Sequence, residues 1–311
     1  MAVADVSRSD VSAFRWRALA WATAQQAHDG GFVAFLNNNG IAYPNDPFPN
    51  RLFVGAKRVI SFPSITEEIN TEPQRNARRT QSITESPDAF QTLRDAQSKN
   101  PSYLVGYFGY DLKNQLETLE SRNPDRLGFP DAYFVEPEWV IDFHETEITV
   151  QGENADQIVH SIRDFVIPSI VNKPVLAVQC RVSPDEYAAT VRRIQQHILA
   201  GDVYELNYCI EFFAENAPLD PLTTYRAMNE RSPMPFSAFL KVGDRYVMSA
   251  SPERFLQKQG QELLSQPIKG TIRRGQNPAE DARLRTQLLN SEKERAENLM
   301  IVDLVRNDLA R

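Results

Sequence analysis

Apolar and polar residues repeat along the N-terminal part of the chain with the periods of a helix and of antiparallel strands. The pattern predicts a helix over residues 14–26, an apolar strand over residues 32–36 and a hairpin over residues 138–150, where apolar and polar residues alternate. Residues 103–110 (YLVGYFGY) are apolar with two glycines, which predicts a buried strand that another backbone approaches closely.

The middle of the chain carries sharper helix and strand signals. Ser183-Pro184-Asp185-Glu186 combines a capping serine, a proline and a glutamate three residues after the cap, which predicts a helix that ends at Gly201. Strict alternation over residues 204–212 then predicts a strand with Tyr204 and its alternate neighbours on a core and the intervening residues on a polar side. Asp220-Pro221 is typical of the start of a short helix.

Two hairpins and two helices are predicted to complete the chain. One hairpin joins 236–240 to 246–249 through Gly243-Asp244, and the other joins 255–258 to 262–265 around Gln259-Gly260. Asn277 and Ser291 each precede a helix pattern and are followed three residues later by glutamate.

Strands that come in hairpins indicate the fold class. Because single strands do not alternate with helices, the pattern favours an α+β antiparallel architecture over a doubly wound sheet. Pro168 and Pro174 bracket a short linker, so we expect an N-terminal region over 1–175 and a second region over 176–311. The last helix pattern runs to the end of the sequence without a glycine, a proline or a polar tail, so we expect that the second region is interrupted there.

Composition and charge narrow the class of protein. The 311 residues carry a net charge of −7 and two cysteines, which argues against a disulfide scaffold, a zinc ribbon and a nucleic-acid-binding protein. No apolar run approaches the roughly 20 residues that a membrane span needs, and the start resembles no secretion signal. We therefore expect a cytoplasmic protein. We interpret the basic cluster at 76–80 (NARRT) as a solvated helix face.

Several familiar catalytic motifs are missing from the sequence. No glycine-rich loop of the dinucleotide or Walker type precedes a helix, and Lys269-Gly270-Thr271 lacks the upstream glycine of a Walker motif. The four histidines share no i, i+4 pairing, and no serine lies in Gly-x-Ser-x-Gly. Hydride transfer, nucleotide hydrolysis, zinc hydrolysis and serine hydrolysis therefore lose support.

A lysine and a glutamate form the first candidate site. A turn at Gln259-Gly260 would place Glu253 opposite Gln266, and Glu253 and Lys269 would lie at the same open end of one hairpin. Alternation would put them on opposite faces unless Pro267 or Gly270 breaks the pleat. Such a pair could act as nucleophile and general acid, or it could be an ordinary surface ion pair.

The lysine nucleophile would have to lose its proton at neutral pH. Desolvation favours the neutral amine, and so does neighbouring positive charge, for which Arg273, Arg274 or a metal ion are the candidates.

Two glutamates on the last helix form the second candidate site. Glu294 and Glu297 are three residues apart and share a helix face with Ile301 and Leu304, so they could hold Mg²⁺, which accepts one or two protein carboxylates and keeps several waters. Alternatively, they complement the helix dipole, and Glu294 belongs to the capping box of Ser291.

Four segments form an ordered set, namely GDVYELNYCIEFF, SASPERF, PIKGTIRRG and KERAENLMIVDLVRNDLAR. In order and spacing they resemble the chorismate-utilising enzymes, the family of the anthranilate synthase and aminodeoxychorismate synthase large subunits. YLVGYFGYDL is similar to their N-terminal half, so the resemblance covers roughly residues 100–311. It implies a layered α/β sandwich of antiparallel sheets, with an N-terminal anthranilate-synthase-component-I-like region and the first part of a chorismate-binding catalytic domain.

The motif around Lys269 distinguishes members of this family. Aminodeoxychorismate synthases carry Pro-Ile-Lys-Gly-Thr, as this sequence does from 267 to 271, where anthranilate synthases carry Pro-Ile-Ala-Gly-Thr. The resemblance therefore implies an aminodeoxychorismate synthase component I, in which Lys269 adds to C2 of chorismate and displaces the 4-hydroxyl group. Ammonia then attacks C4 and expels the lysine, which leaves 4-amino-4-deoxychorismate, a precursor of p-aminobenzoate and folate.

The resemblance also assigns the other site residues and the partners. It implies that Glu253 is the general acid, that Glu297 is a Mg²⁺ carboxylate with Glu294 close by, and that Gly270 and Thr271 contact the substrate carboxylate. A glutamine amidotransferase would supply the ammonia.

Three departures from the family pattern qualify this assignment. Glu205, a candidate substrate contact, stands where many relatives have glutamine, which makes that polar face more acidic. The tryptophan-binding pattern of some relatives is missing from the N-terminal region. The chain also ends where relatives continue with a second Mg²⁺ carboxylate, so we expect little activity from it alone.

Two alternatives to the amination reaction stay open. The first is anthranilate synthase component I, which eliminates pyruvate; Lys269 argues against it. The second is a non-catalytic chorismate-binding or scaffolding subunit.

Overall fold

The computed structural model describes residues 1–5, 7–44, 50–62, 88–119, 121, 123–168 and 176–310. The basic cluster at 76–80 and Pro174 lie outside the described residues. The chain forms two compact units, which are Met1–Ile167 together with Tyr225–Arg311, and Pro168–Thr224. The predicted division into 1–175 and 176–311 stays a prediction.

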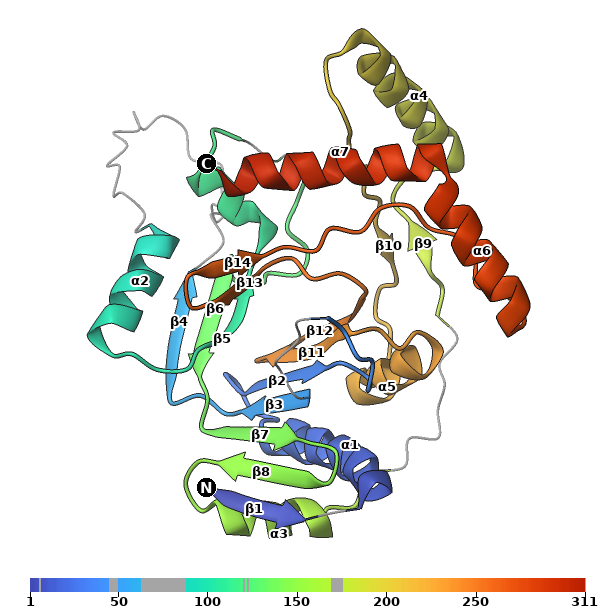
Figure 1. Ribbon diagram of the computed structural model, residues 1–311. Coiled ribbons are helices and arrows are strands. Elements are labelled where there is room, and N and C mark those ends of the chain that lie inside the picture. The colour runs from blue at the N-terminus through green and yellow to red at the C-terminus, as the bar shows by residue number, and fades with distance from the viewer. Residues whose placement is uncertain are drawn as a thin grey trace, which may run out of the picture. The chain divides into compact units, whose positions relative to one another are not determined.

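A seven-stranded antiparallel sheet forms the centre of the first unit (Figure 1). In spatial order its strands are β1 (Ala2–Asp5), β8 (Glu147–Gln151), β7 (Trp139–Phe143), β3 (Asn50–Val54), β2 (Phe32–Asn37), β11 (Phe236–Val242) and β12 (Arg245–Ser251). The β7–β8 and β11–β12 hairpins confirm two of the predicted hairpins, and Gly243 takes the left-handed conformation that the second turn needs. Because β11 pairs with β2, the C-terminal part of the chain extends a sheet that the N-terminal part begins.

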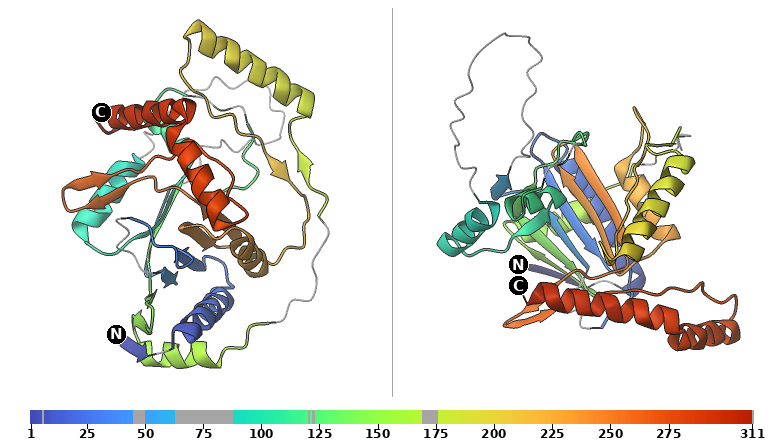
Figure 2. Two further views of the ribbon diagram at one scale, coloured as in Figure 1. Left: turned by 45° about the vertical axis from the view of Figure 1, so that its right-hand side comes forward. Right: turned by 90° about the horizontal axis from the view of Figure 1, so that it is seen from above.

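Two helices cover one face of this sheet (Figure 2). They are α1 (Arg8–Gln25) and α3 (Ala155–Asp164), which pack on each other and bury Leu19 and Ile162 completely. The helix α1 begins six residues before the predicted start, because Ser7 caps it by accepting the Asp10 N–H at 3.3 Å. The apolar pattern begins only after this polar first turn.

A three-stranded sheet packs on the other side of the core. Its order is β4 (Arg58–Phe62), β6 (Ala132–Glu136) and β5 (Val105–Phe108), and Phe32 and Phe53 of the large sheet meet Tyr133 and Val135 of β6. A Cβ atom on Gly106 would lie 1.9 Å from the Tyr133 carbonyl oxygen, which confirms the predicted close backbone approach.

The burial predicted for residues 103–110 is wrong, because alternate residues of β5 face solvent and Phe108 is 53% exposed. Helix α2 (Ala89–Lys99) packs on β4, and a 3₁₀ helix, η1 (Tyr110–Gln115), follows β5. Ala89 and Leu112 of these two helices form a small cluster with Phe62 and Ala132.

The second unit contains β9 (Gln179–Cys180), α4 (Pro184–Ala200) and β10 (Phe212–Phe213). The capping box of Ser183 and Glu186 and the stop at Gly201 are confirmed. The strand predicted over 204–212 is wrong, because regular strand is limited to β10, which pairs with β9. Tyr204 is 62% exposed, and an apolar alternation forms a strand only where partner strands and a core meet it.

The remaining helices and strands carry or flank the candidate site. They are α5 (Pro221–Arg231), β13 (Gln257–Gln259), β14 (Glu262–Leu264), α6 (Pro278–Asn290) and α7 (Glu292–Leu309). Asn277 and Ser291 cap α6 and α7 as predicted. Helices combined with antiparallel sheets confirm the predicted α+β class. None of the described helices combines the length and the apolar character that a bilayer-crossing segment requires.

Candidate active site

The hairpin that carries the first candidate site turns one residue later than predicted. Gln259 pairs with Glu262, so the turn lies at Gly260-Gln261, and Gly260 has a φ of +60°. Continued beyond the ladder, this register brings Glu253 level with Ile268 and not with Gln266. The predicted register is therefore wrong, because the turn is shifted by one residue. Glycine is compatible with either of the two central positions of such a turn, so the sequence did not decide between the two placements.

Glu253 makes a direct contact with the segment that carries Lys269. Its Oε1 accepts the Ile268 N–H at 2.8 Å. The Ser251 hydroxyl accepts the Glu253 N–H at 3.4 Å and donates to the Glu253 carbonyl oxygen at 3.2 Å. The carboxylate of the predicted general acid is thus held beside the residue that precedes the predicted nucleophile.

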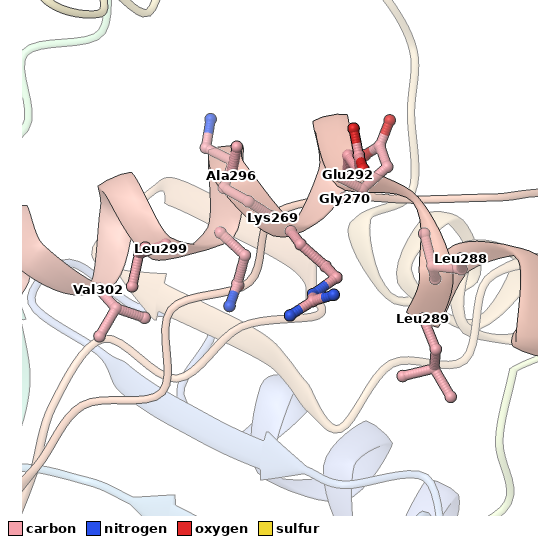
Figure 3. A pocket seen from close by; sticks show the side chains of 11 residues that line it. Lys269, Gly270, Leu288, Leu289, Glu292, Ala296, Leu299 and Val302 are labelled. Atoms are coloured by element: carbon pink, nitrogen blue, oxygen red, sulfur yellow. The ribbon is translucent and has the colours of Figure 1, made fainter.

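Lys269 and Gly270 lie on the wall of a hollow of about 710 Å³ between their segment and the helices α6 and α7. Both residues are half-buried, and Glu294 lines the same hollow. Figure 3 shows Ala296, Leu299 and Val302 along α7 and Leu288 at the adjoining end of α6, around the segment with Lys269. The hollow therefore combines an amine, a carboxylate and an apolar lining.

Gly270 allows α7 to approach this segment closely. Its φ is +80°, and a Cβ atom at this position would lie 3.0 Å from Oε2 and 3.1 Å from Cβ of Glu294. A larger residue would both strain the backbone and displace the glutamate. Thr271 is exposed and does not line the hollow.

The two arginines after Thr271 have carboxylate partners on α6. Arg274 binds Asp281 through two hydrogen bonds of 2.8 and 2.7 Å, and Arg273 binds Glu280. The Arg274 guanidinium and the Gly275 N–H together lower the pKa of Asp281 to about 2. Both guanidinium groups thus bind carboxylates of α6, and their effect on Lys269 stays a prediction.

Glu294 and Glu297 converge on a single positive charge. The Lys293 Nζ lies 3.6 Å from Oε1 of Glu294 and 3.4 Å from Oε1 of Glu297, and Glu297 more than Glu294 raises the pKa of Lys293. The backbone N–H of Glu294 donates to the Ser291 hydroxyl at 3.4 Å, so the serine half of the predicted cap is present. Of the apolar neighbours predicted for this face, Ile301 is half-buried and Leu304 is 45% exposed.

This donor set fits Mg²⁺ in its chemistry. Two carboxylates that reach one ammonium group can reach one hard cation, which needs only one or two protein carboxylates. Within the described part of the chain, no group of three or more histidine, cysteine, aspartate or glutamate side chains could hold a metal ion. The assignment of Mg²⁺ to Glu294 and Glu297 stays a prediction.

Glu205 belongs to the second unit, where it is half-buried in a stretch without regular secondary structure. The hollow with Lys269 and the contact between Glu253 and Ile268 lie within the first unit.

One buried residue next to the site was not expected from the sequence. Arg254 follows Glu253 and is only 7% exposed, although arginine is rarely buried. Glu253 and Arg254 line a second hollow, of about 490 Å³, with Phe236 and Ser251. The signal available in the sequence was the position of Arg254 directly after an outward-facing carboxylate, since successive side chains of an extended chain point to opposite sides.

Comparison with known proteins agrees with this picture. A family model described as chorismate binding enzyme matches residues 47–311. Anthranilate synthase component 1 of Thermus thermophilus is 35% identical over 225 residues, and the match covers 67% of this chain and 48% of that protein. Aminodeoxychorismate synthase of Streptomyces griseus is 49% identical over 231 residues, and the match covers 67% of this chain and 31% of that protein. The chain thus spans about a third to about half the length of these curated relatives.

A solved structure supports the fold. Anthranilate synthase component I from Streptococcus pneumoniae matches with a TM-score of 0.64 at 23% identity, over 88% of this chain and 64% of that chain. At this identity the likeness concerns the fold alone.

Proposed function

Since the chain belongs to the family of chorismate binding enzymes, we propose that it acts on chorismate as an aminodeoxychorismate synthase component I. The observation that carries the proposal is the place of Lys269. Its half-buried side chain lines the hollow that Glu294 also lines, and the preceding residue donates its N–H to Glu253. An amine and a carboxylic acid are the two groups that the amination needs, and Glu253 contacts the residue directly before Lys269.

The proposed reaction has two substitution steps. The neutral amine of Lys269 attacks C2 of chorismate, the C1–C2 and C5–C6 double bonds each shift by one position, and the C4–O bond breaks. Glu253 protonates the departing oxygen, which leaves as water. Ammonia then attacks C4, the double bonds shift back, and the C2–N bond breaks so that the lysine amine is regenerated. Protonation by Glu253 lets the oxygen leave as water and not as hydroxide, which is a poor leaving group.

Other groups of the site would bind the substrate. The backbone at Gly270 and the exposed hydroxyl of Thr271 are the candidate contacts to the ring carboxylate, and Glu205 stays a candidate contact from the second unit. A Mg²⁺ ion held by Glu294 and Glu297 would supply positive charge for that carboxylate.

The relatives carry the names of two different activities, so a second reaction has to be considered. An anthranilate synthase component I would add ammonia at C2 and eliminate pyruvate. It needs no lysine nucleophile, and Lys269 therefore favours amination at C4. A scaffolding subunit would bind chorismate without reacting.

Mass spectrometry of the intact protein tests the nucleophile directly. With chorismate and Mg²⁺ and without ammonia, we expect the chain to gain the mass of chorismate less one water, with the modification on the peptide that contains Lys269. Lys269→Ala should abolish the adduct. Lys258→Ala, which removes an exposed lysine of β13, is the matched control and should keep it.

The same reaction mixture separates the alternatives. Ammonium should then discharge the adduct as 4-amino-4-deoxychorismate. Anthranilate formation without an adduct would assign the second reaction, and binding of chorismate without any product would assign the scaffold. An unchanged adduct in Lys269→Ala would remove this lysine from the mechanism.

We further propose a glutamine amidotransferase as the source of ammonia and a cytosolic location. Cys180 and Cys209 are free and exposed, which suits a reducing compartment. Copurification with an amidotransferase subunit, and amination supported by glutamine in its presence, would test the partner.

A further inference from the structure

Arg254 lies where β12 leads into β13, between the central sheet and the candidate site. Its guanidinium carbon lies 5.2 Å from the centre of the Phe236 ring and 5.8 Å from the centre of the Tyr43 ring. These two rings contact each other edge to face, with centroids 4.9 Å apart. The Nη1 atom of Arg254 donates to Oε1 of Gln257 at 2.5 Å. A planar cation stacked on aromatic rings and hydrogen-bonded at its edge has one well-defined orientation.

The neighbouring residue has the opposite environment. Glu253 is exposed, and its carboxylate accepts the Ile268 N–H, whereas Arg254 is 7% exposed and lies on the rings. The two residues are adjacent in the chain, and successive side chains of an extended backbone point to opposite sides. The burial of the Arg254 side chain therefore fixes the direction in which the Glu253 side chain points. The contacts that surround Arg254 also come from three separate parts of the chain, namely Tyr43, Phe236 and Gln257.

We propose that Arg254 is a positioning residue, whose buried guanidinium anchors the 251–257 segment so that the Glu253 carboxylate stays on the Ile268 N–H and beside Lys269. The catalytic meaning of this position rests on the proposed function, in which Glu253 protonates the leaving oxygen. The geometric claim does not, since it concerns only the hydrogen bond between Glu253 and Ile268. Arg254 touches neither of the groups that react, so it acts through its neighbour.

Hydrogen exchange of the Ile268 amide, followed by NMR on the full chain, tests the geometric claim. Arg254→Met keeps the length of the side chain and removes the guanidinium, and Arg254→Lys keeps the charge and removes the planar fork. We expect the Ile268 amide to exchange at least about tenfold faster in both variants, while the amides of the β11–β12 ladder keep their protection. Unchanged protection at Ile268 in both variants overturns the proposal.

A matched variant and a second readout distinguish positioning from general loss of stability. Glu253→Gln keeps an oxygen acceptor for the Ile268 N–H and removes the acid, so Ile268 should stay protected while the lysine adduct no longer forms. If Arg254→Met also exposes the β11–β12 ladder, Arg254→Lys decides, because faster exchange at Ile268 with an intact ladder supports the proposal. The same protection as in the unmodified chain contradicts it.

Adduct formation completes the test. In Arg254→Lys, we expect the rate of the chorismate adduct to fall about tenfold and chorismate affinity to change less than threefold, because the substrate contacts remain. Faster Ile268 exchange with an unchanged adduct rate would uphold the anchoring role of Arg254 and refute the acid role of Glu253. The two proposals therefore fail separately.

Discussion

The seven-stranded sheet and the segment that carries the candidate site are stabilised in different ways. In β2, every residue except Leu36 is buried, and Phe35, Phe53 and Phe239 are fully buried within the sheet. From residue 253 to residue 310, all of which the structure describes, only Arg254 and Leu284 are buried. Apolar burial therefore stabilises the sheet, whereas the site segment depends on hydrogen bonds, ion pairs and helix caps.

The residues that stabilise the fold and the residues proposed for catalysis therefore lie in different parts of the first unit. A core residue of the sheet contributes several kcal/mol, and an exposed residue of α7 contributes little. The residues proposed for catalysis lie on the weakly buried segment, where local contacts such as Glu253 with Ile268 set the geometry. Substitutions there should change the site without unfolding the sheet.

The largest expected effect is the loss of a fully buried ring from the sheet. Phe239 is 0% exposed and lies between Tyr225 and Tyr246, with centroids 5.4 and 5.9 Å away. Phe239→Ala should lower the free energy of unfolding by about 3–5 kcal/mol, measured by urea denaturation. Leu299→Ala on α7, where the side chain is 69% exposed, is the control and should change it by less than about 0.5 kcal/mol. Equal losses in the two variants would contradict the comparison.

The second prediction concerns alkaline pH and the sheet. Burial raises the pKa of Tyr225 to about 12, while an unfolded tyrosine titrates near about 10. The folded pKa is the higher one, so this contribution to stability is fully present below about pH 10 and is lost as the pH rises toward about 12. Between about pH 9 and about pH 11.5 the loss should be about 2 kcal/mol, as measured by urea denaturation at these two pH values.

Tyr225→Phe provides the control for this pH dependence. It removes the titrating hydroxyl and should weaken the decline at alkaline pH. The remaining decline would come from other groups, such as Tyr107, whose pKa is also raised to about 12. An unchanged decline in Tyr225→Phe would show that this residue does not cause it.

The third prediction concerns the close contact between Gly270 and helix α7. Gly270→Ala should cost about 1–2 kcal/mol in unfolding free energy from its φ of +80°. It should also speed amide exchange in the first turn of α7, because the new Cβ meets Glu294. Gly260 has a similar backbone conformation, with a φ of +60°, but a Cβ atom built there would meet no atom within 4 Å. Gly260→Ala should therefore show the backbone strain without the steric effect. Identical exchange in the two variants would rule out the steric effect on α7.

The smallest expected effect concerns the two carboxylates of α7. Lys293→Gln removes the ammonium group that lies near both Glu294 and Glu297, so Mg²⁺ should bind about two- to fivefold more tightly, as measured by calorimetry. Glu297→Gln should weaken binding. Tighter binding in both variants, or in neither, would speak against a metal site at these residues.

Local signals predicted much of the secondary structure. The capping box at Ser183 and the caps at Asn277 and Ser291 were predictable because capping residues lie within four positions of the groups they satisfy. The turn at Gly243 was predictable for the same reason, because the residues that form a turn are neighbours in the sequence. The first turn of α1 was missed because it is polar and precedes the apolar pattern.

Features that depend on distant partners were predicted less well. The alternation over 204–212 predicted a strand, but the structure provides a partner only at β10. The site hairpin was displaced by one turn position, which changed the residue opposite Glu253 from Gln266 to Ile268. Arg254 was missed because its burial depends on Tyr43, which lies far from it in the sequence.

The sequence by itself determined the antiparallel α+β class and the helix boundaries set by caps. It also identified the lysine of the Pro-Ile-Lys-Gly-Thr motif as the candidate nucleophile. Each of these is a property of neighbouring residues. Only the tertiary structure decided that β11 joins the N-terminal strands, that Glu294 lies against Gly270 and that Arg254 is buried on two rings. The physical reason is that burial, register and the meeting of charged groups depend on which distant segments pack together, and no local pattern contains that information.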